Sequence, residues 1–443
     1  MIKELTPSWL KEQAKQYAGD RGNAMLRHAL SRSSLSSAIF VSQSKPNAMV
    51  SLDLKTMPVC DQHASGRCWI FAGLNLLREL IADKLGAKSF ELSQNYIAFF
   101  DKIEKSNFAL ESLLSLSKGE PSERVYMHIL NDPVSDGGQW DMFVNLVLKY
   151  GLAPKYAYLD TYQASNTRET DFLVNAAIRG FAAKAHKLVH EGKEEEARQL
   201  KEQTMASIYD MFLSAFGFPP ESFRLVYEDK QGKRVDKGEY TPKSFFDEFL
   251  GKEKLLSYQS LINSPTQDKP FMRNFTIDYL GNVIEGNPIN HLNVTMPRME
   301  EAIIAQLKSG TPVWFGSDVS FNRDRELDYW ATETHDYKGS FGFDIAFDKG
   351  DMLTFRHSAM NHAMLIVGVD LDEQGRPLAW KIENSWGEKT GDKGYFYMSE
   401  SWFKTFVYQA VVDKAFLTEQ EKEAASKEPT HLNPWDPMGT LAC

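Results

Sequence analysis

Cysteine is scarce in this chain of 443 residues. The three cysteines are Cys60, Cys68 and Cys443. They are too few and too irregularly spaced for a disulfide framework or for a Cys-x-x-Cys metal site. The cysteine content therefore favours a reducing, cytoplasmic setting. Within this setting Cys60 is interpreted as a buried structural thiol.

Long apolar runs and blocks of like charge are also absent from the sequence. No uninterrupted apolar run approaches the length of a bilayer span, and the N-terminal residues are charged and amphipathic, unlike a secretory signal. The formal net charge is −10 and the pI is about 5.6. This acidic balance argues against a membrane surface or a nucleic acid as the main partner.

The order of the expected elements indicates an α+β protein. The length is compatible with two or three structural units. Ile70, Leu74, Leu77 and Ile81 recur at helical spacing after Cys68, and Gly86 suits a helix C-cap. The last third of the chain instead contains short, bulky, β-prone runs separated by Gly, Pro and Asp. Helices followed by strands predict an α+β layout with a helical insertion between them.

The insertion is expected between about residues 162 and 217, as a helical hairpin. Two apolar stripes with helical spacing support this expectation: Phe172, Ala176, Phe181, Ala185 and Leu188, then Ala197, Leu200, Thr204, Ile208, Met211 and Ala215. A β-hairpin is predicted over 223–235. Thr241 and Pro242 then resemble the N-cap and the first residue of another helix.

Cys68 stands where a helix is expected to begin. Unpaired backbone N–H groups and the helix dipole at that position lower a thiol pKa and favour the nucleophilic thiolate. A thiolate nucleophile needs a proton-carrying partner, for which histidine is best suited at neutral pH. His362 begins a strand-like run, and Asn384 follows another, so the asparagine amide could orient the imidazole. Gln62 could aim its amide N–H at a developing oxyanion, together with the backbone N–H of Cys68.

Each of these residues also has an ordinary structural interpretation. A cysteine beside tryptophan is usually a small buried hydrophobe. His362 could be a structural histidine, and His357 competes for the same chemical role. Asn384 and Gln62, taken singly, would be turn or surface residues. Their joint occurrence favours catalysis over any of these separate interpretations.

The motifs around these residues resemble those of the papain superfamily of cysteine peptidases. The motifs are Q-H-A-S-G-R-C-W from Gln62, N-H-A-M-L-I-V-G around His362, and N-S-W-G from Asn384. The resemblance implies that Cys68 is the nucleophile, His362 the general acid/base, Asn384 its orienting partner and Gln62 the oxyanion donor. It selects His362 over His357 because only His362 lies in the N-H-A frame.

The same resemblance extends to the substrate cleft. D-G-G-Q-W is similar to the glycine pair that lines the cleft in this superfamily, which implies that Gly137 and Gly138 contact substrate. Trp386 would cover the His–Asn hydrogen bond from solvent and border the substrate. The expected fold is papain-like, with a helical half and a β-barrel-like half.

Two departures from papain narrow the resemblance to one subgroup. Ser65 replaces a cysteine that forms a disulfide in secreted relatives, which fits a cytoplasmic chain. Cys68 and His362 lie about twice as far apart as the roughly 130–150 residues of papain-type enzymes. S-G-R-C-W-I-F-A and the C-terminal N-P-W-D-P-M-G resemble the bleomycin hydrolase and bacterial aminopeptidase C family, from Leu54 to the C-terminus.

Membership of that family would have several consequences. It implies a homohexameric chamber and removal of N-terminal residues from peptides with a free N-terminus, through an acyl-enzyme and without cofactor or metal. The C-terminal arm would enter the cleft, with Ala442 or Cys443 near the substrate amine. Cys443 is either trimmed by the enzyme or an ordinary last residue. The implied segments are an N-terminal helical segment, the nucleophile half, the insertion, the His/Asn half and the arm, at 1–53, 54–160, 161–270, 271–417 and 418–443.

Three alternative functions remain open at the level of sequence. An endopeptidase would have an open cleft and a disordered C-terminal tail. A binding or scaffolding chamber would carry a vestigial set of catalytic residues, which the complete set of four argues against. A nucleic-acid-binding protein would bind in a salt-dependent manner, and the acidic charge disfavours it as the main activity.

Overall fold

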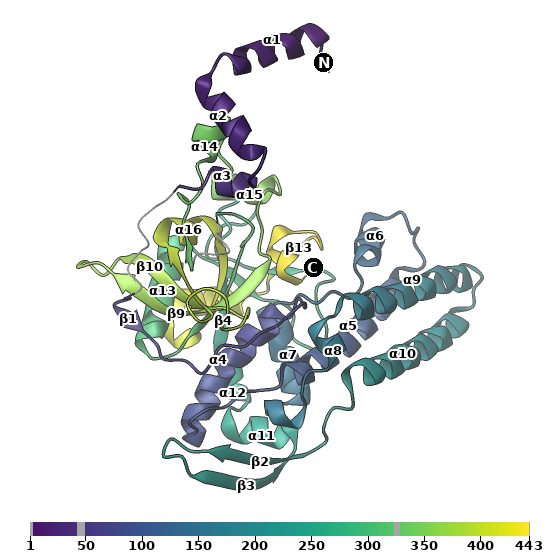
Figure 1. Ribbon diagram of the computed structural model, residues 1–443. Coiled ribbons are helices and arrows are strands. Elements are labelled where there is room, and N and C mark those ends of the chain that lie inside the picture. Colours follow the sequence, from purple (N-terminus) through teal and green to yellow (C-terminus); the bar gives the residue numbers. More distant parts are fainter. Residues whose placement is uncertain (1–2, 42–48, 323–327, 443) are drawn as a thin grey trace.

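The computed structural model describes residues 3–41, 49–322 and 328–442. A helical half and a sheet half lie side by side (Figure 1), and the end of the chain lies between them. Three N-terminal helices extend away from the body at one end of the molecule: α1 (Pro7–Ala18), α2 (Arg21–Leu30) and α3 (Leu35–Ala38).

The helical half is built around α4 (Cys68–Leu85). Ile70, Leu77 and Ile81 are buried, and Gly86 closes the helix with φ of 66°, as the spacing predicts. Helix α4 packs directly against α5 (Gln94–Leu116), α7 (Trp140–Tyr150) and α11 (Pro242–Phe249). The half is completed by α6 (Arg124–Asn131), which packs on α5, by α12 (Lys252–Leu256), which packs on α7, and by the 3₁₀ turn Lys155–Ala157.

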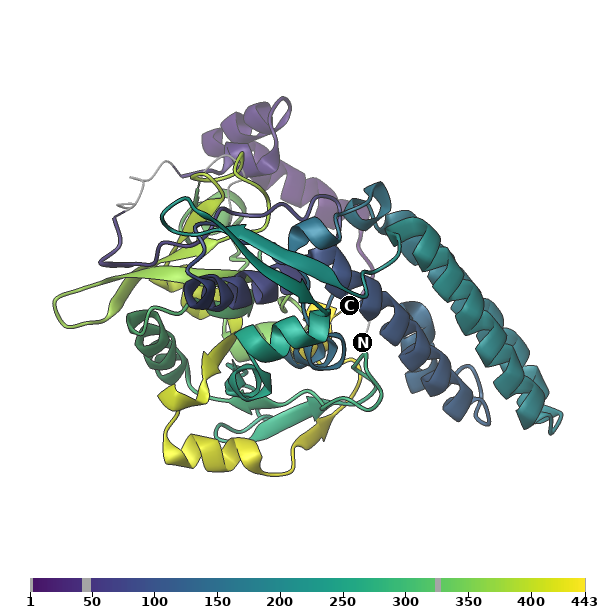
Figure 2. The ribbon, with the colours of Figure 1, turned by 90° about the horizontal axis from the view of Figure 1, so that it is seen from below.

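The predicted helical hairpin is present and projects from the body together with α5 (Figure 2). It consists of the short α8 (Tyr162–Ser165), α9 (Arg168–His190) and α10 (Glu194–Phe216). The β-hairpin is also confirmed, as β2 (Phe223–Glu228) paired with β3 (Arg234–Tyr240). Thr241 caps α11 as expected, with its side chain accepting a hydrogen bond from the backbone N–H of Ser244.

The predicted apolar stripe of α9 is wrong in its first turns. Phe172 is 70% exposed, and the buried face instead contains Val174, Ile178 and Phe181. Val174, Ile178 and Phe181 are spaced at four and three residues, so either phase was compatible with a helix. The packing of α9 against α5 and α10 selects the observed face.

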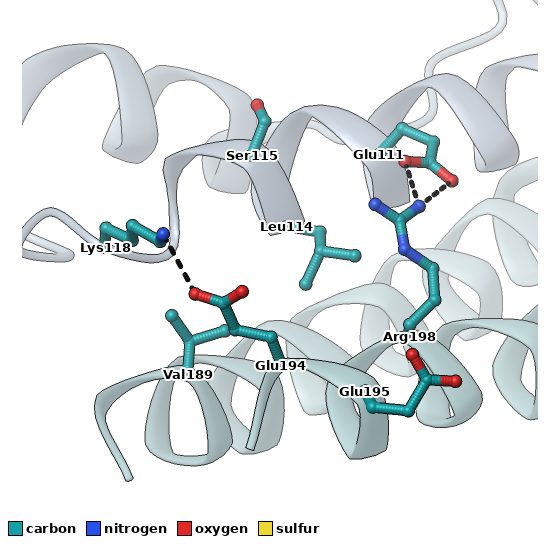
Figure 3. A pocket seen from close by; sticks show the side chains of 8 residues that line it. All are labelled: Glu111, Leu114, Ser115, Lys118, Val189, Glu194, Glu195 and Arg198. Carbon is teal, nitrogen blue, oxygen red and sulfur yellow. Dashed lines mark hydrogen bonds and ion pairs between the residues drawn. The ribbon is translucent and has the colours of Figure 1, made fainter. Parts of the chain in front are cut away.

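A surface pocket of about 340 Å³ lies where the far ends of α5, α9 and α10 meet (Figure 3). Arg198 of α10 donates two hydrogen bonds to the carboxylate of Glu111 in α5, at 2.8 and 2.7 Å. Lys118 pairs with Glu194 at 2.9 Å. These exposed pairs brace the end of the hairpin, and each is expected to contribute less than about 1 kcal/mol.

The sheet half contains one large sheet among the described residues. Its strand order is β13-β5-β6-β4-β12-β7-β9-β10-β11-β8, and β1 also pairs with β9. The strands are β1 (Leu52–Asp53), β4 (Tyr258–Ile262), β5 (Asn274–Ile277), β6 (His291–Asn293), β7 (Val313–Ser317), β8 (Tyr329–Trp330), β9 (His362–Leu371), β10 (Pro377–Glu383), β11 (Tyr395–Ser399), β12 (Val407–Asp413) and β13 (Thr430–Leu432).

Helices cover this sheet, and their apolar side chains complete a second core. They are α13 (Met296–Lys308), α15 (Lys349–Thr354), α16 (Glu400–Phe406) and α17 (Glu419–Ser426). The short α14 (Tyr337–Phe341) has no buried residue, and 3₁₀ turns occur at Lys414–Phe416 and Pro437–Ala442. One half of the molecule is mainly helical and the other is built on a mainly antiparallel sheet, so the predicted α+β class is confirmed. No helix within the described ranges is long and apolar enough to cross a membrane.

The two halves meet at the N-terminal end of α4. The indole N–H of Trp314, on β7, donates to the carbonyl oxygen of Trp69 at 3.2 Å. Strands β9 and β10 are antiparallel neighbours, so the first residue of β9 lies at the same end of the sheet as the residue after β10. His362 and Asn384 therefore meet at the end of these strands that faces α4.

Candidate active site

Cys68 is the first residue of α4, and its side chain is 5% exposed. The backbone N–H of Ala363 donates to its sulfur at 3.4 Å. Because Ala363 follows His362, this contact brings the start of β9 against the thiol. The nucleophile predicted on one half of the molecule thus lies beside the histidine predicted on the other half.

His362 and Asn384 are joined by a hydrogen bond. Nε2 of the imidazole lies 2.9 Å from Oδ1 of Asn384. The backbone N–H of Ser385 donates to the same atom at 2.8 Å, so this atom is the amide oxygen. An oxygen can only accept, and Nε2 therefore carries a proton. The neutral imidazole is held as the tautomer whose Nδ1 is free of its proton, which suits a proton acceptor.

Trp386 packs directly on this pair. Its ring is stacked on the imidazole of His362, with centroids 4.9 Å apart and planes inclined by 23°. The indole covers one face of the ring and holds its plane. His357 lies elsewhere: its Nε2 contacts the carbonyl oxygen of Ile345 at 2.5 Å, and its ring stacks on Phe321.

Gln62 is fixed at both ends of its side-chain amide. Oε1 accepts from the hydroxyl of Ser385 at 2.6 Å, and Nε2 donates to the carbonyl oxygen of Ser65 at 2.6 Å. The backbone N–H of Gln62 also donates to the carbonyl oxygen of Ser385, at 2.9 Å. An amide nitrogen carries two hydrogens, so one N–H of Gln62 remains for a ligand.

The pKa of the Cys68 thiol is raised, whereas the sequence predicts a lowered pKa. Burial raises the pKa of the Cys68 thiol to about 11, although the backbone N–H groups of Ala363 and Trp69 act in the opposite direction. The expected lowering of the pKa by the helix terminus is thus outweighed by the loss of solvent around the sulfur.

The C-terminal arm, residues 433–442, lies between the two halves. The backbone N–H of Gly138 donates to the carbonyl oxygen of Leu441 at 3.0 Å. The hydroxyl of Ser135 donates to the carbonyl oxygen of Ala442 at 2.5 Å. On the other side, the hydroxyl of Thr440 donates to the carbonyl oxygen of Met360 at 2.8 Å. The arm is therefore bound to both halves.

The two glycines predicted in the cleft allow this close approach. A Cβ on Gly137 would overlap the carbonyl oxygen of Leu441, and a Cβ on Gly138 would overlap the ring of Trp69. Ala442 is 6% exposed, because the arm and the glycine segment cover it. Cys443, the remaining residue predicted to contact substrate, lies outside the described residues.

Three residues that orient the catalytic side chains or bind the arm were not identified from the sequence: Ser385, Ser135 and Gln139. Ser385 orients both Gln62 and Asn384, and Ser135 and Gln139 bind carbonyl groups of the arm. Ser385 and Gln139 lie inside the motifs N-S-W-G and D-G-G-Q-W, so their position was a usable signal. Cys60 is buried as expected, with its sulfur accepting from the guanidinium of Arg78 at 3.2 Å.

Comparison with known proteins shows the family to which the chain belongs. The model of the Peptidase C1-like family matches residues 4–439. Aminopeptidase C of Streptococcus thermophilus is 40% identical over 441 residues, which cover 99% of each chain. Aminopeptidase C of Lactobacillus delbrueckii subsp. lactis is 40% identical over 396 residues, which cover 88% of each chain.

A solved structure is similar over nearly the whole chain. The crystal structure of PepW from Lactobacillus rhamnosis HN001 is 37% identical, covers 99% of each chain and superposes with a TM-score of 0.95. The similarity includes the helical insertion and the arm as well as the two halves. The chain therefore belongs to the Peptidase C1-like family, with a papain-like fold, and is an enzyme of the cysteine aminopeptidase class.

Proposed function

We propose that this enzyme removes N-terminal residues from peptides through a thioester acyl-enzyme formed on Cys68. The observation that carries this proposal is the position of the arm. The carbonyl oxygen of Leu441 accepts a hydrogen bond from the backbone N–H of Gly138, and the carbonyl oxygen of Ala442 accepts one from the hydroxyl of Ser135. A substrate with a longer N-terminal extension would have to displace these bonds, whereas a substrate that begins at the cleaved residue would not.

The chemistry follows from the geometry of the four predicted residues. Nδ1 of His362, which the hydrogen bond from Nε2 to Asn384 leaves as the proton acceptor, takes the thiol proton as sulfur attacks the substrate carbonyl carbon. The free N–H of Gln62 and the backbone N–H of Cys68 donate to the oxyanion. The imidazolium then protonates the leaving amine, and water hydrolyses the thioester with His362 as the base.

The arm also accounts for selectivity toward a free N-terminus. A carboxylate at the end of the arm pairs with the ammonium group of the substrate in a charge-assisted hydrogen bond. An N-acyl group removes that charge and adds atoms in the volume that the arm fills. The open cleft of an endopeptidase would require the arm to be displaced, and the contacts of Leu441, Thr440 and Ala442 with both halves argue against it.

The decisive experiment compares two reporter amides that differ only in an N-acetyl group. Each is given to the intact enzyme and to a variant that lacks residues 438–443. The intact enzyme should hydrolyse the free-amine reporter in strong preference, and truncation should reduce that preference. Equal hydrolysis of both reporters by the intact enzyme would contradict the proposal while leaving the cysteine chemistry in place.

The proposal also covers the location, the oligomeric state and the secondary substrates of the enzyme. We place it in the cytoplasm, acting on free peptides as a homohexamer, with bleomycin-like amides as secondary substrates. The exposed apolar side chains Leu5, Trp9 and Leu10 at the beginning of the chain support contact with another copy. Light scattering on the purified enzyme would give the mass of the assembly, and a monomer would contradict this part.

A further inference from the structure

Asp136 connects the nucleophile loop with the segment that binds the arm. One carboxylate oxygen, Oδ2, accepts from the backbone N–H of Gly66 at 2.7 Å and from the hydroxyl of Thr167 at 2.5 Å. Its backbone carbonyl oxygen accepts from the indole N–H of Trp69 at 2.7 Å. Gly66 and Trp69 flank Cys68, so Asp136 holds the chain on both sides of the nucleophile.

The carboxylate of Asp136 is kept ionised by a buried lysine. Nζ of Lys102 lies 2.8 Å from Oδ1 of Asp136 and 2.5 Å from Oδ1 of Asp171. Burial alone would raise the pKa of Asp136, but Lys102 and the hydrogen-bond donors hold it below its usual range. A charged acceptor makes a stronger hydrogen bond to Gly66 than a neutral one would.

The residues around Asp136 also orient the cleft segment. Nζ of Lys105 donates to the carbonyl oxygens of Ser135, at 3.0 Å, and of Gly137. With these carbonyls turned toward Lys105, Ser135 and Gly138 present their donors to the arm. One short segment therefore binds the arm on one side and, through Asp136, the nucleophile loop on the other.

From these contacts we infer that Asp136 is a positioning residue for the reaction: it fixes the loop from Gln62 to Cys68, and with it the oxyanion donors, against the cleft segment. This inference rests on the proposed function. Asp136 acts on the catalytic side chains through the backbone of Gly66 and the indole of Trp69. Gly66 has no side chain because a Cβ there would lie 2.6 Å from the Cβ of Asp136.

Three variants separate positioning from the general effect of a buried charge. Asp136→Ala removes the acceptor of Gly66. Gly66→Ala leaves every charge in place but forces the loop away from Asp136. Asp171→Asn is the matched control, because it removes the other partner of Lys102 without affecting Gly66. Melting temperature identifies any variant that does not fold, and Gly66→Ala and Asp136→Ala serve as independent tests of the same bond.

The measurement is kcat and KM on the free-amine reporter, together with the rate at which iodoacetamide alkylates Cys68, located by peptide mass. Asp136→Ala and Gly66→Ala should lower kcat by about 10²-fold with little change in KM, as expected for a small displacement of catalytic groups. Cys68 should still be alkylated, since alkylation needs no oxyanion donor. Asp171→Asn should stay close to the wild type.

Two results would overturn the inference. One is a loss of kcat in Asp171→Asn equal to that in Asp136→Ala, which would assign the effect to Lys102. The other is an unchanged kcat in both Asp136→Ala and Gly66→Ala. Failure of the proposed function is recognised separately, because the wild-type enzyme itself would then show no preference for the free-amine reporter.

Discussion

The backbone N–H of Gly138 donates a hydrogen bond of 3.0 Å to the carbonyl oxygen of Leu441, the second-last residue of the described chain. The chain thus binds its own C-terminal arm with Gly138, a residue that the sequence predicts to contact substrate. Leu441 is 3% exposed, so the arm is packed as part of the core and does not lie loosely on the surface. This packing is the basis of the proposal that the arm limits the length of an acceptable substrate.

Replacement of Cys68 separates the nucleophile from the other described thiol. Cys68→Ala should lower kcat by about 10⁴-fold or more, because no other group can form the thioester. Cys60→Ala should leave kcat nearly unchanged and lower the melting temperature, because Arg78 loses a buried contact. The two variants are compared on the free-amine reporter, and strong activity in Cys68→Ala would contradict the assignment.

Ser385 should matter through Gln62. Gln62→Ala removes an oxyanion donor and should lower kcat by about 10²-fold. Ser385→Ala leaves the amide of Gln62 without the donor at 2.6 Å and should lower kcat less, by about tenfold. In a double-mutant cycle, Ser385→Ala should cause little further loss of kcat when Gln62 has already been replaced by Ala. Additive losses would show that the hydroxyl of Ser385 does not act through Gln62.

The base of the arm offers a test that spares the active site. Asp436 pairs with the buried Lys269 at 2.8 Å. Asp436→Asn should loosen the arm and raise hydrolysis of the N-acetylated reporter about tenfold, the ratio that about 1.4 kcal/mol produces. Lys422→Ala, which removes the exposed pair with Glu419, is the control and should change nothing. An unchanged reporter ratio in Asp436→Asn would mean that this pair does not hold the arm.

Asp141 should make stability depend on pH. Burial raises the pKa of its carboxyl group to about 6 in the folded protein, from an ordinary value of 3.8. The native state therefore holds the proton more tightly than the unfolded state, and stability falls as pH rises from about 4 to about 6. Asp141→Asn should raise the free energy of unfolding at pH 7 by up to about 3 kcal/mol and have little effect at pH 4.

Urea unfolding of the wild type and of Asp141→Asn at the two pH values measures this difference directly. The asparagine keeps an oxygen that can accept from the backbone N–H of Asn290, at 3.1 Å in the wild type. A gain of equal size at both pH values would point to packing and would exclude the charge of Asp141 as the cause.

The local features that were predicted correctly depend on neighbouring residues. The helix from Cys68 to Gly86 follows from apolar spacing and a glycine C-cap, and the cap at Thr241 follows from its own side chain. The face of α9 was predicted wrongly at Phe172, because the choice between two helical phases is made by contacts with α5 and α10. Short-range signals specify elements, and packing selects their buried faces.

By itself, the sequence determined which residues are chemically suited to the reaction: Cys68 at a helix start, His362 at a strand start, and Asn384 and Gln62 in their motifs. Only the tertiary structure decided the state and the surroundings of these groups. Burial raises the pKa of the Cys68 thiol, against the local effect of the helix. Asp136 joins Gly66 to a segment distant in the sequence, and the arm returns to Gly138. Solvation and long-range contacts depend on every element that packs around a group, so the pattern near one residue could not reveal them.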